Sequence, residues 1–240
     1  MGNGQNLYFI LANSAALSKG QLLINGFLVY INRFLVALVL SIFFGNGAIL
    51  AGVEEDYAIA KQSFDSGDYK AAVAAWGPLG EEGHSRSQVM LGYAYKNGMG
   101  VVKNNKTSFK WYAKAAAQRD SYAQFKVGSA YTDGEGVLGN NQTAVKWFNL
   151  AAKQGFGNAQ YMLAVNYYNG RGVGKDYKRA YMWCTLALHN GTQLANNIKG
   201  KIAERLMSYH PKRGWRDEYA SLSEAQEMSR ICLESDYQTC

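Results

Sequence analysis

Apolar side chains recur every three or four residues along most of the chain, which predicts a largely helical protein. In the stretch SYAQFKVGSAYTD, for example, Ala123, Val127, Ala130 and Tyr131 follow this spacing and would share one face of a helix. Segments in which apolar and polar residues alternate, as in a half-buried strand, do not occur. The pattern therefore predicts an all-α fold.

Pairs of glycines interrupt the helical pattern at a fixed interval of 36 residues. The segments are NGMGV at 97–101, DGEGV at 133–137 and NGRGV at 169–173. A fixed interval of this size indicates a repeat architecture. The predicted units are 87–122, 123–158 and 159–194. Each unit reads as a helix, a turn in which glycine permits the chain to reverse, and a second helix.

The second unit contains GEGVLG, residues 134–139, which matches the glycine spacing of dinucleotide-binding loops. Such a loop binds pyrophosphate where a buried strand precedes it and a helix N-terminus follows it. Here the preceding residues have a helical period, and the third glycine, Gly139, corresponds to Lys103 and Lys175 in the other units. The segment is therefore interpreted as a repeat turn, and no cofactor is predicted.

Positions that keep the same kind of side chain in all three units define the expected core. Small residues predict close helix crossings at Gly92, Gly128, Ala164, Ala115, Ala151 and Ala187. Large aromatic residues are expected between the helices at Tyr95, Tyr131, Tyr167, Trp111, Trp147 and Trp183. The N-caps of the second helices are expected at Asn104 or Asn105, Asn140 or Asn141, and Asp176.

These units resemble the Sel1-like repeat (SLR) family, whose members are relatives of the tetratricopeptide repeat. The resemblance rests on the pattern A-x-x-x-L-G-x-x-Y-x-x-G-x-G-V followed by a capped K-A-x-x-W-Y-x-K-A-A-x-x-G, and it covers residues 87 to about 190. It implies a right-handed α-solenoid of helix-turn-helix repeats, an alpha-alpha superhelix. The sequence departs from the pattern at Ala164, Cys184 and Arg119-Asp120, and none of these changes breaks the helical scheme.

The segments on either side of the repeats are predicted to cap the open ends of the array. Residues 52–86 are similar to an opening tetratricopeptide hairpin. Residues 195–240 are expected to form two closing helices separated by an exposed loop at 208–220. The second closing helix is expected to begin with a capping box at Ser223 and Gln226.

Residues 1–51 are expected to lie outside the folded domain. The apolar run at 34–44, followed by small residues, has the layout of a secretory signal peptide with cleavage after Ala51 or Ala48. An uncleaved membrane anchor is the alternative. Residues 1–28 fit neither interpretation, and a translation start assigned too far upstream would account for them.

The three cysteines of the sequence fall into a pair and a single residue. Cys232 and Cys240 enclose a short tail after the last predicted helix, and in an exported protein a disulfide that pins such a tail is expected. The resemblance supports this pairing, because exported relatives end in a similar C-x7-C. Cys184 stands where the other units have Tyr112 and Phe148, so it is expected to be a buried, unpaired thiol.

Charge and residue types argue against several classes of function. The net charge of +7 is mild, and the one basic cluster, at 199–216, is interrupted by Glu204, so no nucleic-acid binding is predicted. No G-x-S-x-G motif occurs, and His84, His189 and His210 are too scattered for a zinc site. Some exported relatives bridge the helices of every repeat with cysteine pairs, which this chain lacks, so their suggested hydrolase-like properties are not expected. We predict no catalytic residue and no metal site.

First-helix positions that differ between the units are free to recognise a partner, since positions that stay the same are structural. The residues predicted to contact a partner on the concave face are Tyr93, Lys96, Lys126, Ser129, Asn166 and Tyr168. These observations predict a non-enzymatic scaffold, periplasmic or secreted, that binds another protein or a peptide. A scaffold that binds peptidoglycan or another saccharide is the alternative, and an envelope hydrolase is a third. Membrane contact is expected only through an uncleaved N-terminal segment.

Overall fold

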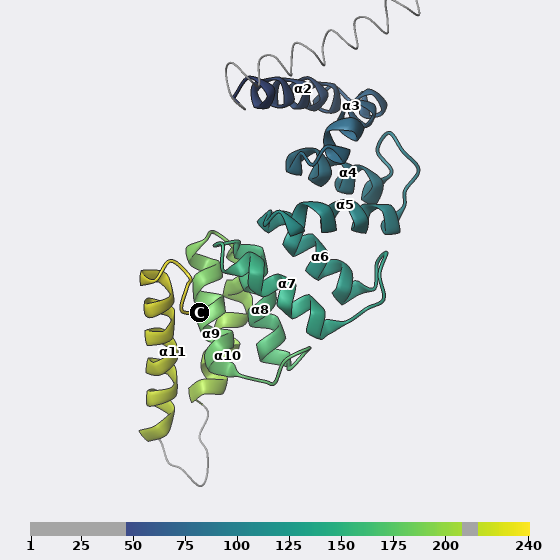
Figure 1. Ribbon diagram of the computed structural model, residues 1–240. Helices are drawn as coiled ribbons and strands as arrows, with labels where there is room; N and C mark the ends of the chain where they lie inside the picture. Colours follow the sequence, from purple (N-terminus) through teal and green to yellow (C-terminus); the bar gives the residue numbers. More distant parts are fainter. Residues whose placement is uncertain (1–46, 208–215) are drawn as a thin grey trace, which may run out of the picture. The chain divides into compact units, whose positions relative to one another are not determined.

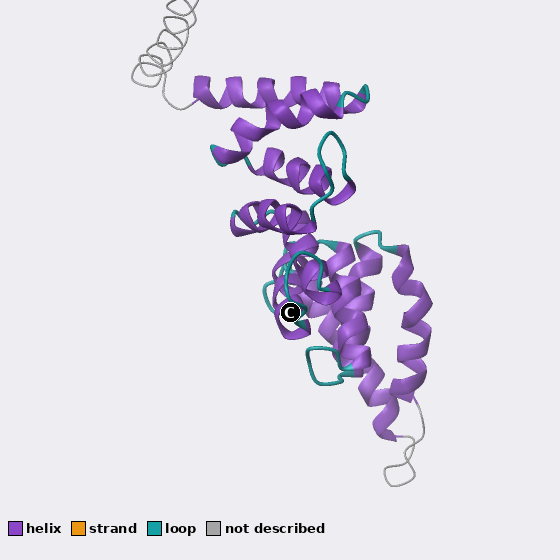
Figure 2. Ribbon diagram, turned by 90° about the vertical axis from the view of Figure 1, so that its right-hand side faces the viewer, coloured by secondary structure: helices purple, strands orange, loops and turns teal. Residues whose placement is uncertain are grey.

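The computed structural model describes residues 47–207 and 216–240, and all the regular elements in these two ranges are helices (Figure 1). None of the described residues forms a strand, as Figure 2 shows. In chain order the elements are α2 (Gly47–Asp65), α3 (Tyr69–Glu81), α4 (Ser85–Asn97), α5 (Asn105–Ala117), α6 (Ser121–Asp133), α7 (Asn141–Ala152), α8 (Gly157–Asn169), α9 (Tyr177–His189), the 3₁₀ turn η1 (Gln193–Ala195), α10 (Asn196–Met207) and α11 (Arg216–Glu234). The prediction of an all-α fold is confirmed.

The chain divides into two compact units, Met1–Ala58 and Ile59–Cys240, and the repeats lie in the second. There, α4 with α5, α6 with α7, and α8 with α9 form three successive hairpins, each packed on the next. The helices of a hairpin cross closely because a small residue faces an aromatic ring. A Cβ atom added at Gly92 would lie 2.9 Å from the Tyr112 ring, which is closer than van der Waals contact allows. The fold is an α-solenoid of helix-turn-helix repeats, as predicted.

The two glycines of each turn have different structural roles. The first glycine ends the first helix in the left-handed conformation, at Gly98 (φ 74°), Gly134 (φ 70°) and Gly170 (φ 75°). The second glycine lies against the first residue of the second helix in the preceding hairpin. At Gly136, an added Cβ atom would collide with the backbone carbonyl of Asn105. Gly100 and Gly172 make the same approach to the backbone of Tyr69 and Asn141. The second glycine of each turn therefore joins consecutive hairpins.

The second helix of each hairpin begins at a side-chain cap, again at intervals of 36 residues. The Asn104 and Asn140 side chains each accept a hydrogen bond of 2.9 Å from a backbone N–H three residues later. The carboxylates of Asp68 and Asp176 accept the same bond, at 3.0 and 2.9 Å. The cap thus falls on the first asparagine of each Asn-Asn pair. The cap at Asp68 also shows that α3 begins in the same way as the second helices of the later hairpins.

A row of buried side-chain amides connects the hairpins, and sequence reasoning did not identify it. Gln88, Gln124 and Gln160, each at most 3% exposed, donate to backbone carbonyls near the end of the preceding second helix. Each also accepts a hydrogen bond from an amide near the end of its own hairpin's second helix. The donors of these second bonds are Gln118, Gln154 and Asn190, at distances of 2.8, 2.7 and 2.9 Å. The row satisfies buried polar groups that would otherwise be unpaired.

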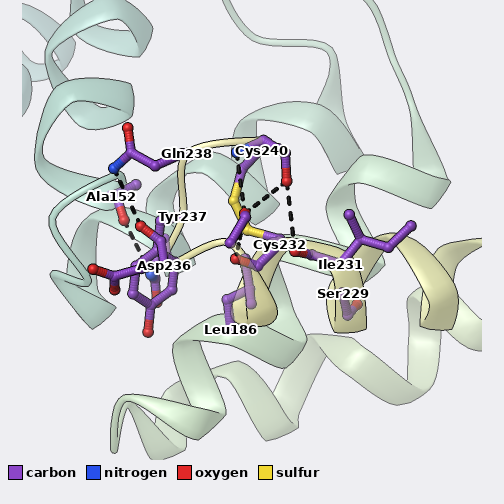
Figure 3. Close-up of a disulfide and its surroundings, with 12 residues drawn as sticks. Ala152, Leu186, Ser229, Ile231, Cys232, Asp236, Tyr237, Gln238 and Cys240 are labelled. Atoms are coloured by element: carbon purple, nitrogen blue, oxygen red, sulfur yellow. Dashed lines mark hydrogen bonds between the residues drawn. A yellow bond between two sulfur atoms is a disulfide. The ribbon is translucent and has the colours of Figure 1, made fainter.

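The segment after α11 closes this row of amides. Cys232 and Cys240 are joined by a disulfide with Cα atoms 5.2 Å apart, a separation typical of this bond (Figure 3). On the turn between the two cysteines, the Tyr237 hydroxyl exchanges hydrogen bonds with the side chain of Asn190, at 2.8 and 3.0 Å. The Tyr237 ring packs on Gly155, where an added Cβ atom would lie 3.3 Å from it. The tail therefore covers the loop after α7 and the end of α9.

The two closing helices differ in part from the prediction. Helix α10 lies where the first was expected, and the Cys184 thiol is buried and free beside it, as predicted. The expected loop at 208–220 extends too far, because residues 216–220 belong to α11; residues 208–215 lie outside the described residues. The expected capping box at Ser223 is wrong for the same reason, since Ser223 lies inside α11.

The predicted boundary at residue 51 falls within a helix, because α2 begins at Gly47 and continues to Asp65. The apolar run at 34–44, on which the prediction of a signal peptide or anchor rests, lies outside the described residues. No helix among the described residues is long and apolar enough to cross a membrane.

Candidate functional site

Three of the six residues predicted to contact a partner line one small pocket. Lys96 comes from α4, and Lys126 and Ser129 come from α6, the first helix of the next hairpin. Asn105 and Tyr112 of α5 contribute to its wall, and the pocket has a volume of about 90 Å³. The sequence comparison thus selected side chains that meet in space, although they belong to different repeats.

The pocket is electrostatically positive. Lys96 forms an ion pair with Glu135, which lies in the turn after α6. Burial lowers the pKa of Lys96, and the nearby positive charges of Lys103 and Lys126 lower it further. The Lys126 ammonium lies 5.0 Å from the centroid of the Tyr122 ring, and no carboxylate among the described residues pairs with it.

Two buried polar atoms belong to residues of the pocket wall and have no well-aligned hydrogen-bond partner among the described residues. They are the Tyr112 hydroxyl, on a side chain 4% exposed, and Asn105 Oδ1. Burial raises the pKa of Tyr112 above its usual range, and the neighbouring Tyr122 adds to the effect, so the hydroxyl remains protonated. The Ser129 hydroxyl, in contrast, already donates to the Phe125 carbonyl at 3.1 Å.

The other three predicted contact residues do not line this pocket. Tyr93 and Tyr168 are partly buried and pack against the rings of Phe64 and Tyr177, with centroids 6.2 and 5.7 Å apart. Asn166 is only 4% exposed, so its side chain offers almost no surface to a partner. The equivalent residues in the other repeats, Ala94 and Ala130, are small. This signal in the sequence indicates a position with little space for a side chain.

A second hollow, which sequence reasoning missed, follows the third repeat. It is an open groove of about 800 Å³ formed by the loops after α7 and α9 and the start of α10. Its side chains include the amides of Asn158, Gln193 and Asn197 and the ring of Phe156, and none of its lining residues is charged. The groove depends on loops that meet only in the folded chain, so no single segment of sequence identifies it.

The described residues show no further chemical centre. Within 47–207 and 216–240, no three His, Cys, Asp or Glu side chains gather closely enough to hold a metal ion. Burial raises the pKa of the Cys184 thiol to about 12, which makes it a poor nucleophile at neutral pH. The positive pocket and the uncharged groove are two candidate contact sites among the described residues.

Comparison with protein families identifies the repeats. The model of the Sel1 repeat matches residues 85–120, 121–156 and 157–191. These matches begin two residues before the unit boundaries expected from the sequence. No curated protein matches the chain.

Two solved structures share this arrangement. The crystal structure of a Sel1 repeat protein from Oxalobacter formigenes is 27% identical, with a TM-score of 0.60 over 75% of this chain and 77% of that one. A protective antigen present in uropathogenic Escherichia coli strains, which displays an SLR fold, is 28% identical, with a TM-score of 0.55 over 73% of this chain. The match covers 40% of the antigen, so this chain corresponds to less than half of its length.

Proposed function

Because the chain carries three Sel1 repeats, we propose that it is a non-catalytic scaffold that binds a partner protein through the surface of its first helices. Sel1 repeat proteins are generally protein-interaction scaffolds. The observation that carries the proposal is the pocket shared by Lys96, Lys126 and Ser129. These positions vary between repeats, and their side chains gather at one place on the described surface.

The distribution of structural roles supports this surface. The repeated caps, turn glycines and buried amides all serve the packing of one hairpin on the next. None of these roles requires a lysine at position 96 or 126, since the following repeat has Thr132 and Met162 there. A lysine that these repeated packing contacts do not require, placed beside a pocket, is available for recognition.

An envelope or extracellular setting is part of the proposal. Disulfides persist in oxidising compartments, and Cys232 and Cys240 form one. The apolar run at 34–44 has the layout of an export signal. The similar protein from Escherichia coli is a protective antigen, which agrees with an exposed location for that protein.

Capture of the partner with paired variants tests the proposal. The native chain is compared with a Lys96→Ala, Lys126→Ala variant and with a Lys110→Ala, Lys146→Ala control, whose lysines are exposed on the second helices. Both variants lose two positive charges, so a nonspecific charge effect would weaken both equally. The proposal predicts one partner, identified by mass spectrometry, that the native chain and the control bind and the pocket variant loses. Equal binding by all three would contradict it.

The uncharged groove after the third repeat favours a second candidate function, the binding of a saccharide. Amide side chains and an aromatic ring without charged neighbours suit a neutral ligand rich in hydroxyl groups. Sedimentation with purified peptidoglycan tests it, using an Asn158→Ala, Asn197→Ala variant. Binding that the variant loses would support this function, and an absence of sedimentation by the native chain would refute it.

A further inference from the structure

The geometry points to a binding site for one acidic side chain of the partner protein in the pocket between α4, α5 and α6. This inference rests on the proposed function, because it specifies the chemistry by which the same surface recognises its partner. It follows from the charge, the open hydrogen-bonding groups and the size of the pocket.

Among the residues that line the pocket, Lys126 is a positive charge without an ion-pair partner in the described chain, whereas Lys96 also interacts with the charge of Asp133. Lys96, Lys126 and Glu135 are its charged lining residues. Glu135 forms an ion pair with Lys96, whereas the ammonium of Lys126 lies over the aromatic rings of Tyr122 and Phe125. A carboxylate from outside would pair with Lys126 and leave the pair of Lys96 and Glu135 intact. Such a pair is stronger at a partly buried site than at an open surface, because solvent screens it less.

The hydrogen-bonding groups of the pocket wall indicate how a carboxylate would be held. The Lys126 ammonium can donate to a carboxylate oxygen, and the protonated Tyr112 hydroxyl can do so once it exchanges its contact with Tyr122. Asn105 Oδ1 is a buried acceptor with no donor among the described residues, and a carboxylate cannot satisfy it. The carboxylate is therefore expected to bind on the Lys126 side of the pocket. Because the proposed partner is a protein, the carboxylate would come from one of its acidic side chains.

The size of the pocket limits the group that can enter. Its volume of about 90 Å³ corresponds to roughly three water molecules at their liquid volume of about 30 Å³ each. A carboxylate with its methylene group has this size, whereas an aromatic ring does not fit. Size and charge therefore select Asp or Glu.

The next interface along the array lacks these features. The positions equivalent to Lys126, Tyr112 and Ser129 are Met162, Phe148 and Val165. The carboxylate site is therefore expected once, between the first and second repeats. The same comparison identifies substitutions that the fold should tolerate, because Met162 and Phe148 already occupy the positions equivalent to Lys126 and Tyr112 in the next repeat.

Two small probes test the inference on the full chain. They are N-acetyl-glutamate N-methylamide, which has a carboxylate and a backbone amide, and its glutamine analogue, which has the same shape without charge. Binding is followed through the backbone amide signals of α6 in isotope-labelled protein. The variants are Lys126→Met and Tyr112→Phe, and Lys110→Met is the control for loss of an exposed lysine.

The glutamate probe is expected to shift signals around Lys126 and Ser129 at concentrations at least about tenfold lower than the glutamine probe. Lys126→Met should weaken glutamate binding by about tenfold or more, Tyr112→Phe by a smaller factor, and Lys110→Met not measurably. Equal affinity for the two probes, or unchanged binding in Lys126→Met, would overturn the inference. Failure of the proposed function would appear separately, as the absence of a captured partner that depends on Lys96 and Lys126.

Discussion

Alanine substitution at each of the two glycines of one turn is expected to separate two energetic costs. One is the left-handed backbone conformation, and the other is the close contact of the second glycine with the preceding hairpin. Gly134 and Gly136 stand in the same turn and have nearly the same left-handed φ, 70° and 76°. A Cβ atom at Gly134 would meet no atom closer than 3.8 Å, whereas one at Gly136 would collide with the backbone of Asn105. The difference between the two alanine variants therefore measures the contact between hairpins.

The expected magnitudes follow from these two contributions. A left-handed conformation costs a residue with a Cβ atom about 1–2 kcal/mol relative to glycine, and both variants carry this cost. Overpacking against a neighbour that cannot move adds about 1–3 kcal/mol. Because the atoms that a Cβ at Gly136 would meet are backbone atoms at the start of α5, no side-chain rotation relieves the overlap. Gly136→Ala should therefore destabilise the protein by about 2–5 kcal/mol.

Urea denaturation followed by circular dichroism compares the two variants with the native chain. The account predicts that Gly136→Ala lowers the free energy of unfolding by at least about 1 kcal/mol more than Gly134→Ala. Gly172→Ala, whose Cβ would meet the backbone of Asn141 in the same way, should behave like Gly136→Ala. Equal destabilisation by Gly134→Ala and Gly136→Ala would refute the role assigned to the second glycine.

Three further predictions concern the buried amides and the cysteines. Gln124→Leu should lower the free energy of unfolding by about 1–3 kcal/mol in a urea titration, because the Ala116 carbonyl loses its donor; no change would show that the amide row does not contribute. Cys184 should not react with a thiol reagent at pH 8 until the protein is unfolded, because burial raises its pKa to about 12; stoichiometric labelling of the native protein would contradict this. A Cys232→Ser, Cys240→Ser variant should unfold at a lower urea concentration, with a loss of about 2–3 kcal/mol from chain entropy; an unchanged midpoint would show that the disulfide does not hold the tail.

The helices and turns were predictable because the signals that set them are local and recur three times. A residue of the same kind recurs every 36 residues at the glycine of each left-handed turn, at the cap of each second helix and at each close helix crossing. The buried state of Cys184 followed from the aromatic residues at its equivalent positions. In each case, comparison between repeats separated structural positions from variable ones.

The remaining features depend on contacts that no local pattern encodes. Glutamine is usually a surface residue, so Gln88, Gln124 and Gln160 were overlooked, although their regular spacing was visible in the sequence. The ion pair of Lys96 with Glu135 joins residues 39 positions apart, and the packing of three helices brings them together. The pocket itself could therefore not be derived from spacing, although three of its lining residues could.

Site-specific photo-crosslinking shows whether a partner binds at the surface of the first helices. A diazirine amino acid is placed at Ser129, beside the pocket, or at Lys110, on an exposed second-helix position, and the full chain is irradiated in cells that contain its partner. The account predicts a crosslinked partner protein from position 129, with little or none from position 110. Equal crosslinking from the two positions, or crosslinking only from position 110, would contradict binding at the surface of the first helices.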